Sequence, residues 1–209
     1  MSAPTRDKLL DATLRVVTDQ GIAKASARTI ATEAGVNQAL VFYHFGSVDE
    51  LLAAACAHGA AQRVAAHRET LRGISGFGDL VTAARAIHRA EREAGNVALL
   101  GQLLAGTSSH PALAGPTREG LDLWVVEVEA VLRRLTEATV LADVVDVPGL
   151  ARAISASFVG LGLYDGVDAP GTEQAFGALE QLAAVLTVVE DLSPLERAAV
   201  RRRLRRTAL

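Results

Sequence analysis

Hydrophobic residues recur at helical spacing along most of this 209-residue chain. Within residues 6–20, Leu10, Leu14 and Val17 repeat every three or four positions and Gly21 follows, which predicts a helix with one buried face. Similar patterns predict helices at 27–34, 38–45, 48–71, 79–94, 96–106, 117–140, 148–165, 173–191 and 194–206. Glycine and proline punctuate the breaks, at 73–78, 95, 110–111, 115–116, 147–148 and 168–171. Long runs typical of strands are absent, so the sequence predicts an all-α fold.

The segment around residue 30 predicts a short helix that ends in a tight turn. Ile30, Ala31 and Ala34 form an apolar stripe at helical spacing. Ser26 is suited to cap this helix, because its hydroxyl can accept a hydrogen bond from an unpaired amide of the first turn. Gly35 then ends the helix where a left-handed residue costs least.

A second short helix follows and carries polar and aromatic side chains on one face. Asn37 is its predicted N-cap, while Leu40 and Val41 face inward. The outer face is left with Gln38, Ala39, Phe42, Tyr43 and His44. Two such helices joined by a tight turn predict a helix-turn-helix, whose second helix enters the major groove of DNA.

This region resembles the N-terminal domain of TetR-type (tetracycline-repressor-like) transcriptional regulators. The resemblance covers residues 6–52 and rests on Ile30-Ala31, Ala34-Gly35-Val36, Phe42-Tyr43-His44-Phe45 and Asp49-Glu50-Leu51-Leu52. Two positions depart from the family pattern: Ala39 stands where glycine is common, and Val48 stands where a lysine often contacts a phosphate. The resemblance implies a helix-turn-helix DNA-binding domain over residues 1–47 and a ligand-binding and dimerisation domain over 48–209.

Each candidate DNA contact has a structural alternative. The Gln38 carboxamide can bond bidentately to adenine, or it is a solvated surface group. Tyr43 and His44 can donate to phosphates or pack at the corner of the domain, and Phe42 can touch a thymine methyl or merely pack. The candidate DNA-binding residues are Ser26, Arg28, Asn37, Gln38, Ala39, Phe42, Tyr43, His44 and Ser47.

Capping signals mark the start of two further helices. Ser47 and Glu50 have the spacing of a capping box before the long helix that follows. The free amides at this helix start can hold a phosphate without a lysine. Ser193, Pro194 and Glu196 mark the start of the last helix in a similar way.

The net charge of −3 is unevenly distributed. Residues 1–47 carry five basic and four acidic side chains, residues 48–192 carry ten and nineteen, and residues 193–209 carry six and one. DNA repels an acidic region, so we expect the N-terminal region to make the DNA contact. The arginine-rich C-terminal helix is interpreted as a solvated end that complements its helix dipole. Pairing with the acidic region and direct DNA binding are its alternatives.

Composition indicates a cytoplasmic protein without a membrane partner. Cys56 is the only cysteine, so no disulfide forms within the chain. The N-terminus carries Arg6, Asp7, Lys8 and Asp11 where a signal peptide needs apolar residues. No uncharged apolar stretch approaches the roughly 18 residues that a membrane span requires.

The sequence predicts neither an enzyme nor a metal or cofactor site. The four histidines outside the helix-turn-helix are scattered over different segments, without a pair at ligand spacing. The segment Ser108-Ser109-His110 lacks the strand-turn-helix elbow that presents a nucleophilic serine. Asp165 and Asp168 are better explained as turn residues than as catalytic acids.

The resemblance also implies a pocket for a small molecule in the larger domain. The sequence marks its walls weakly, because Trp124, the only tryptophan, can either line a cavity or fill the core. Candidate pocket residues are Phe77, Leu103, Trp124, Val128, Phe158 and Tyr164. Few buried charges are evident, so we expect an apolar or amphipathic effector.

The helices at 148–165 and 173–191 are so apolar that each must bury more than one face. In TetR-like proteins the corresponding helices commonly pack against their copies as a four-helix bundle. Candidate interface residues are Ile154, Phe158, Leu161, Phe176, Leu179, Leu182 and Leu186. A homodimer with two recognition helices on a two-fold axis is expected to bind a palindromic operator in double-stranded DNA.

These patterns together predict a TetR-like repressor that a small-molecule effector releases from its operator. Such an effector needs different affinities for the DNA-competent and incompetent states. A protein of the same fold that is controlled by a protein partner is the alternative, and a stable co-purifying partner would favour it. An enzyme on an all-α core would need a cluster of titratable residues that the sequence does not offer.

Overall fold

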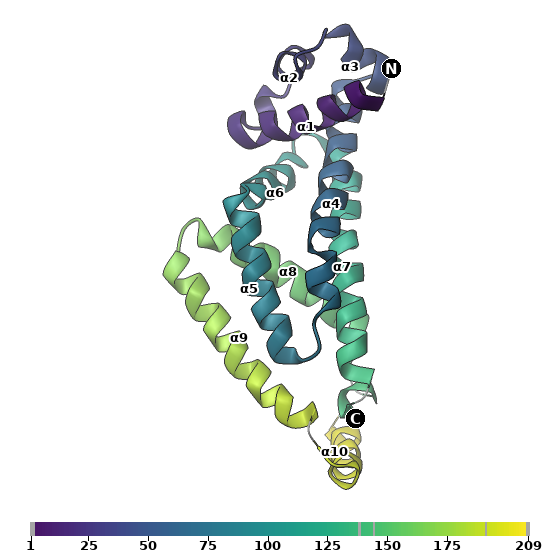
Figure 1. The fold of residues 1–209 in the computed structure, drawn as a ribbon, viewed down its shortest axis with the longest axis vertical. Helices are drawn as coiled ribbons and strands as arrows, with labels where there is room; N and C mark the ends of the chain where they lie inside the picture. The colour runs from purple at the N-terminus through teal and green to yellow at the C-terminus, as the bar shows by residue number, and fades with distance from the viewer. Residues whose placement is uncertain (1–2, 138, 144, 191, 208–209) are drawn as a thin grey trace. The chain divides into compact units, whose positions relative to one another are not determined.

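The computed structural model describes residues 3–137, 139–143, 145–190 and 192–207, and these residues form helices and short connections without strands (Figure 1). The α-helices are α1 (Ala3–Gln20), α2 (Ala27–Ala34), α3 (Ala39–Phe45), α4 (Val48–Arg72), α5 (Phe77–Glu93), α6 (Asn96–Gly106), α7 (Ala114–Glu137), α8 (Val147–Asp165), α9 (Ala169–Glu190) and α10 (Pro194–Thr207). Three short 3₁₀ turns are η1 (Ile22–Lys24), η2 (Pro111–Leu113) and η3 (Val140–Asp143). The predicted all-α fold is confirmed.

Five helices begin earlier than the sequence predicts: α1, α5, α7, α8 and α9. Helix α9 begins at Ala169, so the break before it comprises residues 166–168 and not the expected 168–171. Proline is tolerated in the first helical turn, where its missing N–H has no partner to lose, and Pro170 lies there. The Asp168 carboxylate also accepts a hydrogen bond from the Gly171 N–H at 2.9 Å. Helix α7 likewise includes the expected break at 115–116 in its first turn.

The chain folds into two compact units. The first comprises the residues up to Ala66 together with Glu91–Leu123, and the second comprises His67–Ala90 and the residues from Trp124 onward. The helix-turn-helix therefore shares its unit with the first half of α4 and with α6. The expected functional division at residue 47 stays a prediction.

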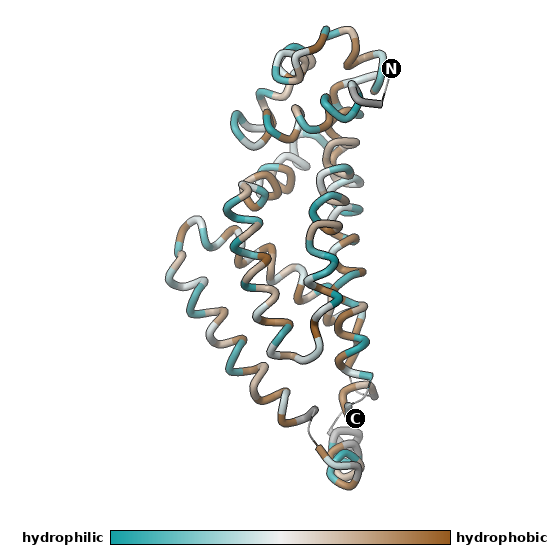
Figure 2. Tube along the Cα trace, viewed as in Figure 1, coloured by the Kyte–Doolittle hydropathy of each residue, from teal (hydrophilic) through white to brown (hydrophobic). Residues whose placement is uncertain are grey.

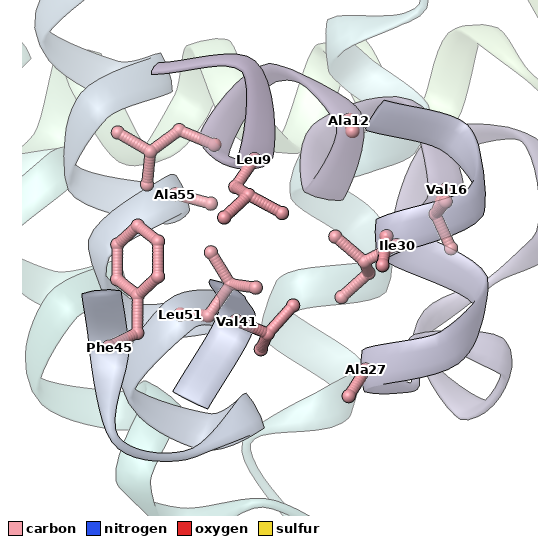
Figure 3. Close-up of a cluster of buried hydrophobic side chains, with 11 residues drawn as sticks. Leu9, Ala12, Val16, Ala27, Ile30, Val41, Phe45, Leu51 and Ala55 are labelled. Atoms are coloured by element: carbon pink, nitrogen blue, oxygen red, sulfur yellow. The ribbon is translucent and has the colours of Figure 1, made fainter. Parts of the chain in front are cut away.

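One hydrophobic cluster holds α1, α2, α3 and the start of α4 together (Figure 3). Leu9, Ile30, Val41 and Leu51 have no exposed surface, and Phe45 is 9% exposed. Each of these side chains contributes about 1.5–3 kcal/mol by leaving water. This cluster packs α1, α2 and α3 together as one element rather than as separate arms.

A second cluster in the same unit joins α6 to α1 and α4. Its buried members are Val17, Leu52, Cys56, Leu99, Leu103 and Leu113. Burial raises the pKa of the Cys56 thiol from 9.0 to about 11, because a thiolate would lose its hydration in this apolar setting. Cys56 is therefore a packing residue and not a reactive thiol.

The core of the second unit combines α5, α7, α8 and α9. Its buried side chains are Leu71, Ile74, Phe77, Ala83, Ile87, Val131, Leu135 and Ala183. Polar links add to this packing: Arg85 on α5 pairs with Glu180 on α9 at 3.2 Å, and His88 lies 3.9 Å from Asp165 on α8. Helices α8 and α9 are thus both fixed to α5.

By length and composition alone, one helix among the described residues, α8, could cross a membrane, although Arg152 and Asp165 interrupt its apolar sequence. Its 18-residue window has a mean hydropathy of 1.2, and 11% of that window is buried within the chain. The pair α3 and α4, bent by 67°, meets the same length and composition criterion only if counted as one span. This finding concerns length and composition alone, and an apolar helix face of this kind equally suits contact with another protein.

Candidate nucleic-acid interface

Local hydrogen bonds fix the bounds of α2. The Ser26 hydroxyl accepts a hydrogen bond from the Thr29 N–H at 3.1 Å, which confirms the predicted N-cap. Gly35 has φ 66° and ψ 36°, the left-handed conformation predicted for it. Its N–H and that of Val36 bond to the carbonyls of Thr32 and Ala31 at 3.1 and 2.9 Å, the paired bonds of a Schellman motif. The turn is therefore set by residues within the segment itself.

The start of α3 is fixed by Asn37. Its side-chain oxygen accepts a hydrogen bond from the Ala39 N–H at 2.8 Å, so the predicted capping role of Asn37 is confirmed. The helix begins at Ala39, one residue later than predicted. Gln38 has helical backbone angles, makes no side-chain cap hydrogen bond and is exposed. The Gln38 carboxamide is thus available to a partner that binds the exposed start of α3.

The inner face of α3 anchors the helix to the domain. Val41 is fully buried, Phe45 nearly so, and Leu40 packs against the same cluster (Figure 3). The guanidinium of Arg6 on α1 lies over the Phe45 ring, 5.2 Å from its centroid, where the ring face attracts a cation. These contacts fix the rotation of α3 about its axis.

The outer face of α3 is uncharged and exposed. Tyr43 is 79% exposed and Phe42 is 49% exposed, although both are large aromatic residues. Ala39 is exposed beside them. His44 is partly buried, and its ring and the Tyr43 ring meet edge to face with their centroids 5.0 Å apart. The structure therefore brings the predicted recognition residues of α3 onto one surface, although their contact with DNA stays a prediction.

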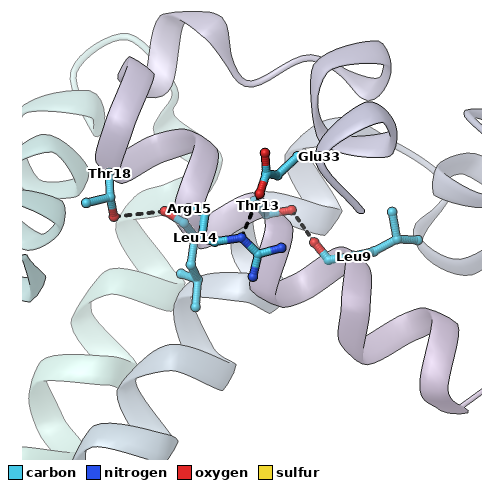
Figure 4. Close-up of polar contacts among 6 residues, drawn as sticks. All are labelled: Leu9, Thr13, Leu14, Arg15, Thr18 and Glu33. Atoms are coloured by element: carbon cyan, nitrogen blue, oxygen red, sulfur yellow. Dashed lines mark hydrogen bonds and ion pairs between the residues drawn. The ribbon is translucent and has the colours of Figure 1, made fainter. Parts of the chain in front are cut away.

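An ion pair joins α1 to α2 behind this surface. The Arg15 Nε atom lies 2.7 Å from Oε1 of Glu33 (Figure 4). Along α1, the hydroxyls of Thr13 and Thr18 donate to the carbonyls one turn earlier, at 2.7 and 2.9 Å (Figure 4). The sequence analysis did not single out the Arg15–Glu33 pair, because its partners lie eighteen residues apart and no local pattern connects them.

The two serines predicted to contact DNA use their hydroxyls inside the protein. The Ser26 hydroxyl also bonds to the Thr29 hydroxyl at 2.8 Å. The Ser47 hydroxyl accepts from the Glu50 N–H at 3.1 Å, and the Ser47 N–H donates to the Phe45 carbonyl at 2.9 Å. The capping box predicted at the start of α4 is therefore half formed, because Glu50 does not receive the Ser47 N–H.

Positive charge lies beside α3 and not on it. Arg28 in the first turn of α2 is exposed, as is Lys24 at the end of η1. Lys24 was not among the predicted contacts, although a basic residue two positions before the cap Ser26 is the signal that could have identified it. These two cations are suited to phosphates, because basic side chains position a protein on DNA without selecting a base sequence.

The predicted pocket residues are divided between the two units. Leu103 is buried in the first unit, whereas the other five belong to the second. There Phe77 is buried, Trp124 and Phe158 border the core, and Tyr164 is 62% exposed. Tyr164 lies on an open groove of about 550 Å³ between α8 and α9, which Ser157, Gly160, Leu161, Asp168, Gly171, Thr172 and Ala175 also line.

The predicted interface residues fall into two groups. Phe176 is 1% exposed, so it belongs to the core of its own subunit and offers no surface to a partner. Ile154, Leu161 and Leu186 are partly buried, as is Phe158, while Leu179 and Leu182 are 40% and 56% exposed. Further exposed apolar residues on the same two helices and the turn between them are Leu163, Tyr164, Val167, Val185 and Val188. Hydrophobic positions alternate with hydrophilic ones along α9 (Figure 2).

Within the described part of the chain, no three His, Cys, Asp or Glu side chains are grouped so as to hold a metal ion. The histidines instead make pairwise contacts: His58 with Asp11 at 3.3 Å, and His110 with Asp49 at 3.9 Å. The expectation that the protein needs no metal stays a prediction.

Comparison with known proteins points to one family. Residues 9–55 match the sequence profile of bacterial regulatory proteins of the tetR family. Comparison with proteins of curated function finds no match.

Solved structures extend the similarity over most of the chain. A transcriptional regulator from Streptomyces coelicolor A3(2) is 26% identical, with a TM-score of 0.68 over 86% of this chain and 98% of its own. A TetR-family regulator from a Rhodococcus species is 24% identical, with a TM-score of 0.71 over 90% and 98%. The multidrug binding protein EbrR, in complex with imidazole, is 29% identical, with a TM-score of 0.60 over 85% and 94%.

Proposed function

We propose that this chain, which belongs to the TetR family of DNA-binding transcriptional regulators, is a repressor that binds a palindromic operator as a homodimer. A small-molecule effector releases it from DNA, and it acts in the cytoplasm without enzymatic activity. The observation that carries this proposal is the outer face of α3. Two large aromatic side chains are exposed there on a short helix whose other face is fully packed.

The exposed rings of Phe42 and Tyr43 leave apolar surface in water, and a bound partner would gain free energy by covering that surface. Gln38 can supply the paired donor and acceptor that adenine requires in the major groove. Tyr43 can donate to a phosphate, and Phe42 can contact a thymine methyl. Arg28 and the amides at the start of α4 add contacts to the phosphate backbone.

Helices α8 and α9 support the homodimer. Leu179, Leu182, Val185 and Val188 are all at least 40% exposed along one helix. A second copy of the chain would remove this apolar surface from water, and two-fold symmetry would then present two copies of α3 to two half-sites. Leu182→Glu should dissociate the dimer in sedimentation velocity experiments. Val126→Glu on α7, which changes a valine that is 64% exposed, is the matched control.

The similarity to EbrR, a multidrug binding protein solved with imidazole and with proflavin, supports a small-molecule effector. The apolar or amphipathic character of the effector is proposed from the core of the second unit. The second unit of this chain has an aromatic and aliphatic core of its own. An effector that binds the DNA-incompetent state more tightly must be bound more weakly when operator is present, by the same factor.

Selection of binding sites from random DNA tests the proposal directly. Purified full-length protein at near-physiological salt should enrich a palindrome with two matching half-sites, whose centres lie about one helical turn apart or a multiple of it. A single asymmetric site would contradict the homodimeric mode of binding. No enrichment by a folded dimer would contradict operator binding by the free protein.

A further inference from the structure

Three buried polar atoms without hydrogen-bond partners lie on neighbouring helices of the second unit. They are Nε of Arg85 and Nδ1 of His88 on α5, and Oγ of Ser155 on α8. Folded proteins leave few buried polar atoms unpaired, because such atoms have lost water and gained nothing in return. Three such atoms in one region therefore indicate a site where a bound molecule supplies the missing hydrogen bonds.

Two aromatic rings connect these atoms. The His88 ring meets the Phe158 ring edge-on, with the two ring centroids 6.0 Å apart. The centroid of the Phe176 ring lies 5.3 Å from that of His88. The Arg85 guanidinium lies over the Phe176 ring at 5.5 Å. Ser155 is one helical turn before Phe158 on α8 and thus shares its face. The unpaired atoms surround the same pair of phenylalanines.

The surrounding charges decide which chemistry fits. Asp165 lies 3.9 Å from Nε2 of His88, and both side chains are less than 10% exposed. Because Nε2 is the ring nitrogen nearer the carboxylate, we assign the imidazole proton to Nε2, and this tautomer has a hydrogen-bond acceptor at Nδ1. Arg85 is already matched by Glu173 at 3.7 Å and Glu180 at 3.2 Å. With three carboxylates against one guanidinium, the region disfavours an anionic ligand.

We propose that these residues bind an uncharged aromatic hydroxyl, a phenol, as part of the effector. The inference rests on the proposed function and adds the chemical class of the ligand. The ligand hydroxyl donates to Nδ1 of His88 and accepts from both Oγ of Ser155 and Nε of Arg85. Its ring packs against Phe158 and Phe176. Phe158 is only partly buried at the edge of the core, so it is the side chain that moves to admit the ligand.

Phenol itself is the first probe. Binding to the full-length protein is followed by thermal melting and by the fluorescence of Trp124, which borders the same apolar cluster as Phe158. Phenol should raise the melting temperature saturably. Anisole, which keeps the ring but cannot donate, and benzoate, which is anionic, should not. Equal effects of phenol and anisole would overturn the proposal.

Ser155→Ala and His88→Phe separate a binding role from a structural one. Ser155→Ala removes an unpaired buried atom, so its melting temperature should equal or exceed that of the wild type. Its affinity for phenol should fall about tenfold or more. His88→Phe should show the same loss of affinity, and Ser157→Ala, an exposed serine on the same helix, should show none. Unchanged phenol affinity in both variants would refute the site.

Operator binding is measured on the same preparations. Selection of a palindrome without any binding of phenol would refute the ligand site and leave the DNA-binding proposal standing. Binding of phenol without selection of any DNA sequence would refute the DNA-binding proposal and leave the ligand site standing. The two proposals therefore fail by different measurements.

Discussion

The backbone N–H of Ile22 donates a hydrogen bond to Oε1 of Gln102 at 3.2 Å, across eighty residues of sequence. Ile22 begins the turn between α1 and α2, and Gln102 lies in the middle of α6. Gly106, one turn further along α6, leaves room for Ile22, because a Cβ there would come within 2.9 Å of the Ile22 Cδ1 atom. Helix α6 thus holds the connection that leads into the helix-turn-helix.

Gln102→Ala should weaken this connection. The Ile22 N–H would lose its partner in a partly buried position, which costs about 1 kcal/mol of unfolding free energy. Urea denaturation measures this cost, with Gln174→Ala, an exposed glutamine on α9, as the control. Operator affinity should fall as well, because the start of α2 follows directly after this turn. Equal stability of both variants would show that the hydrogen bond contributes nothing.

Gly35→Ala should destabilise the protein through the backbone. A side chain at φ 66° costs roughly 1–2 kcal/mol, and the space around Gly35 is open, so no clash contributes. Gly78→Ala is the control, since Gly78 lies within α5 and also has open space. There alanine should be neutral or slightly stabilising. A similar change in unfolding free energy for both variants would contradict the left-handed turn.

Two substitutions on α3 should have different effects on DNA binding. Gln38→Ala should cost about 1–3 kcal/mol and relax preference at one base position in each half-site. Tyr43→Phe should weaken binding to all sequences alike, because a phosphate contact carries no base information. Competition assays with single-base operator variants distinguish these results. Unchanged affinity and base preference in Gln38→Ala would remove Gln38 from the recognition surface.

Stability should fall at alkaline pH because of Cys56. The folded state raises the pKa of this thiol from 9.0 to about 11, so the folded protein keeps the proton that the unfolded chain releases. The contribution is fully present below pH 9 and is lost as pH rises toward 11, by up to about 2–3 kcal/mol. Cys56→Ala should lack this loss in urea titrations at pH 8, 9.5 and 10.5. If the unfolding free energies of the wild type and of Cys56→Ala fall in parallel as pH rises, the Cys56 thiol does not cause the loss of stability.

Much of the helix-turn-helix follows from its own sequence. Ser26, Gly35 and Asn37 fix helix ends through hydrogen bonds to residues at most five positions away, so their roles could be predicted from spacing alone. The same holds for Ser193 and Glu196 at the start of α10. The Ser193 hydroxyl accepts a hydrogen bond from the Glu196 N–H at 3.4 Å, and the Glu196 carboxylate accepts one from the Ser193 N–H at 2.9 Å. The helix starts near Pro116 and Pro170 were misjudged, because proline both ends helices and begins them.

The larger domain was less predictable. Apolar periodicity marked Phe176 and Leu182 as equivalent members of one stripe, yet Phe176 is buried in its own subunit and Leu182 is 56% exposed. Leu103, a predicted pocket residue, packs in the core of the first unit. Periodicity shows that a face is apolar and leaves open which surface covers it.

The sequence by itself determined most of the helices, the caps of the helix-turn-helix and which face of α3 is exposed, because these depend on residues within one or two turns of each other. Only the tertiary structure decided that Gln102 holds Ile22, that Arg15 meets Glu33, and that His88 lies against Asp165. Each of these contacts joins side chains on different helices, and helix packing places them together through the fit of whole surfaces. No local spacing encodes that fit.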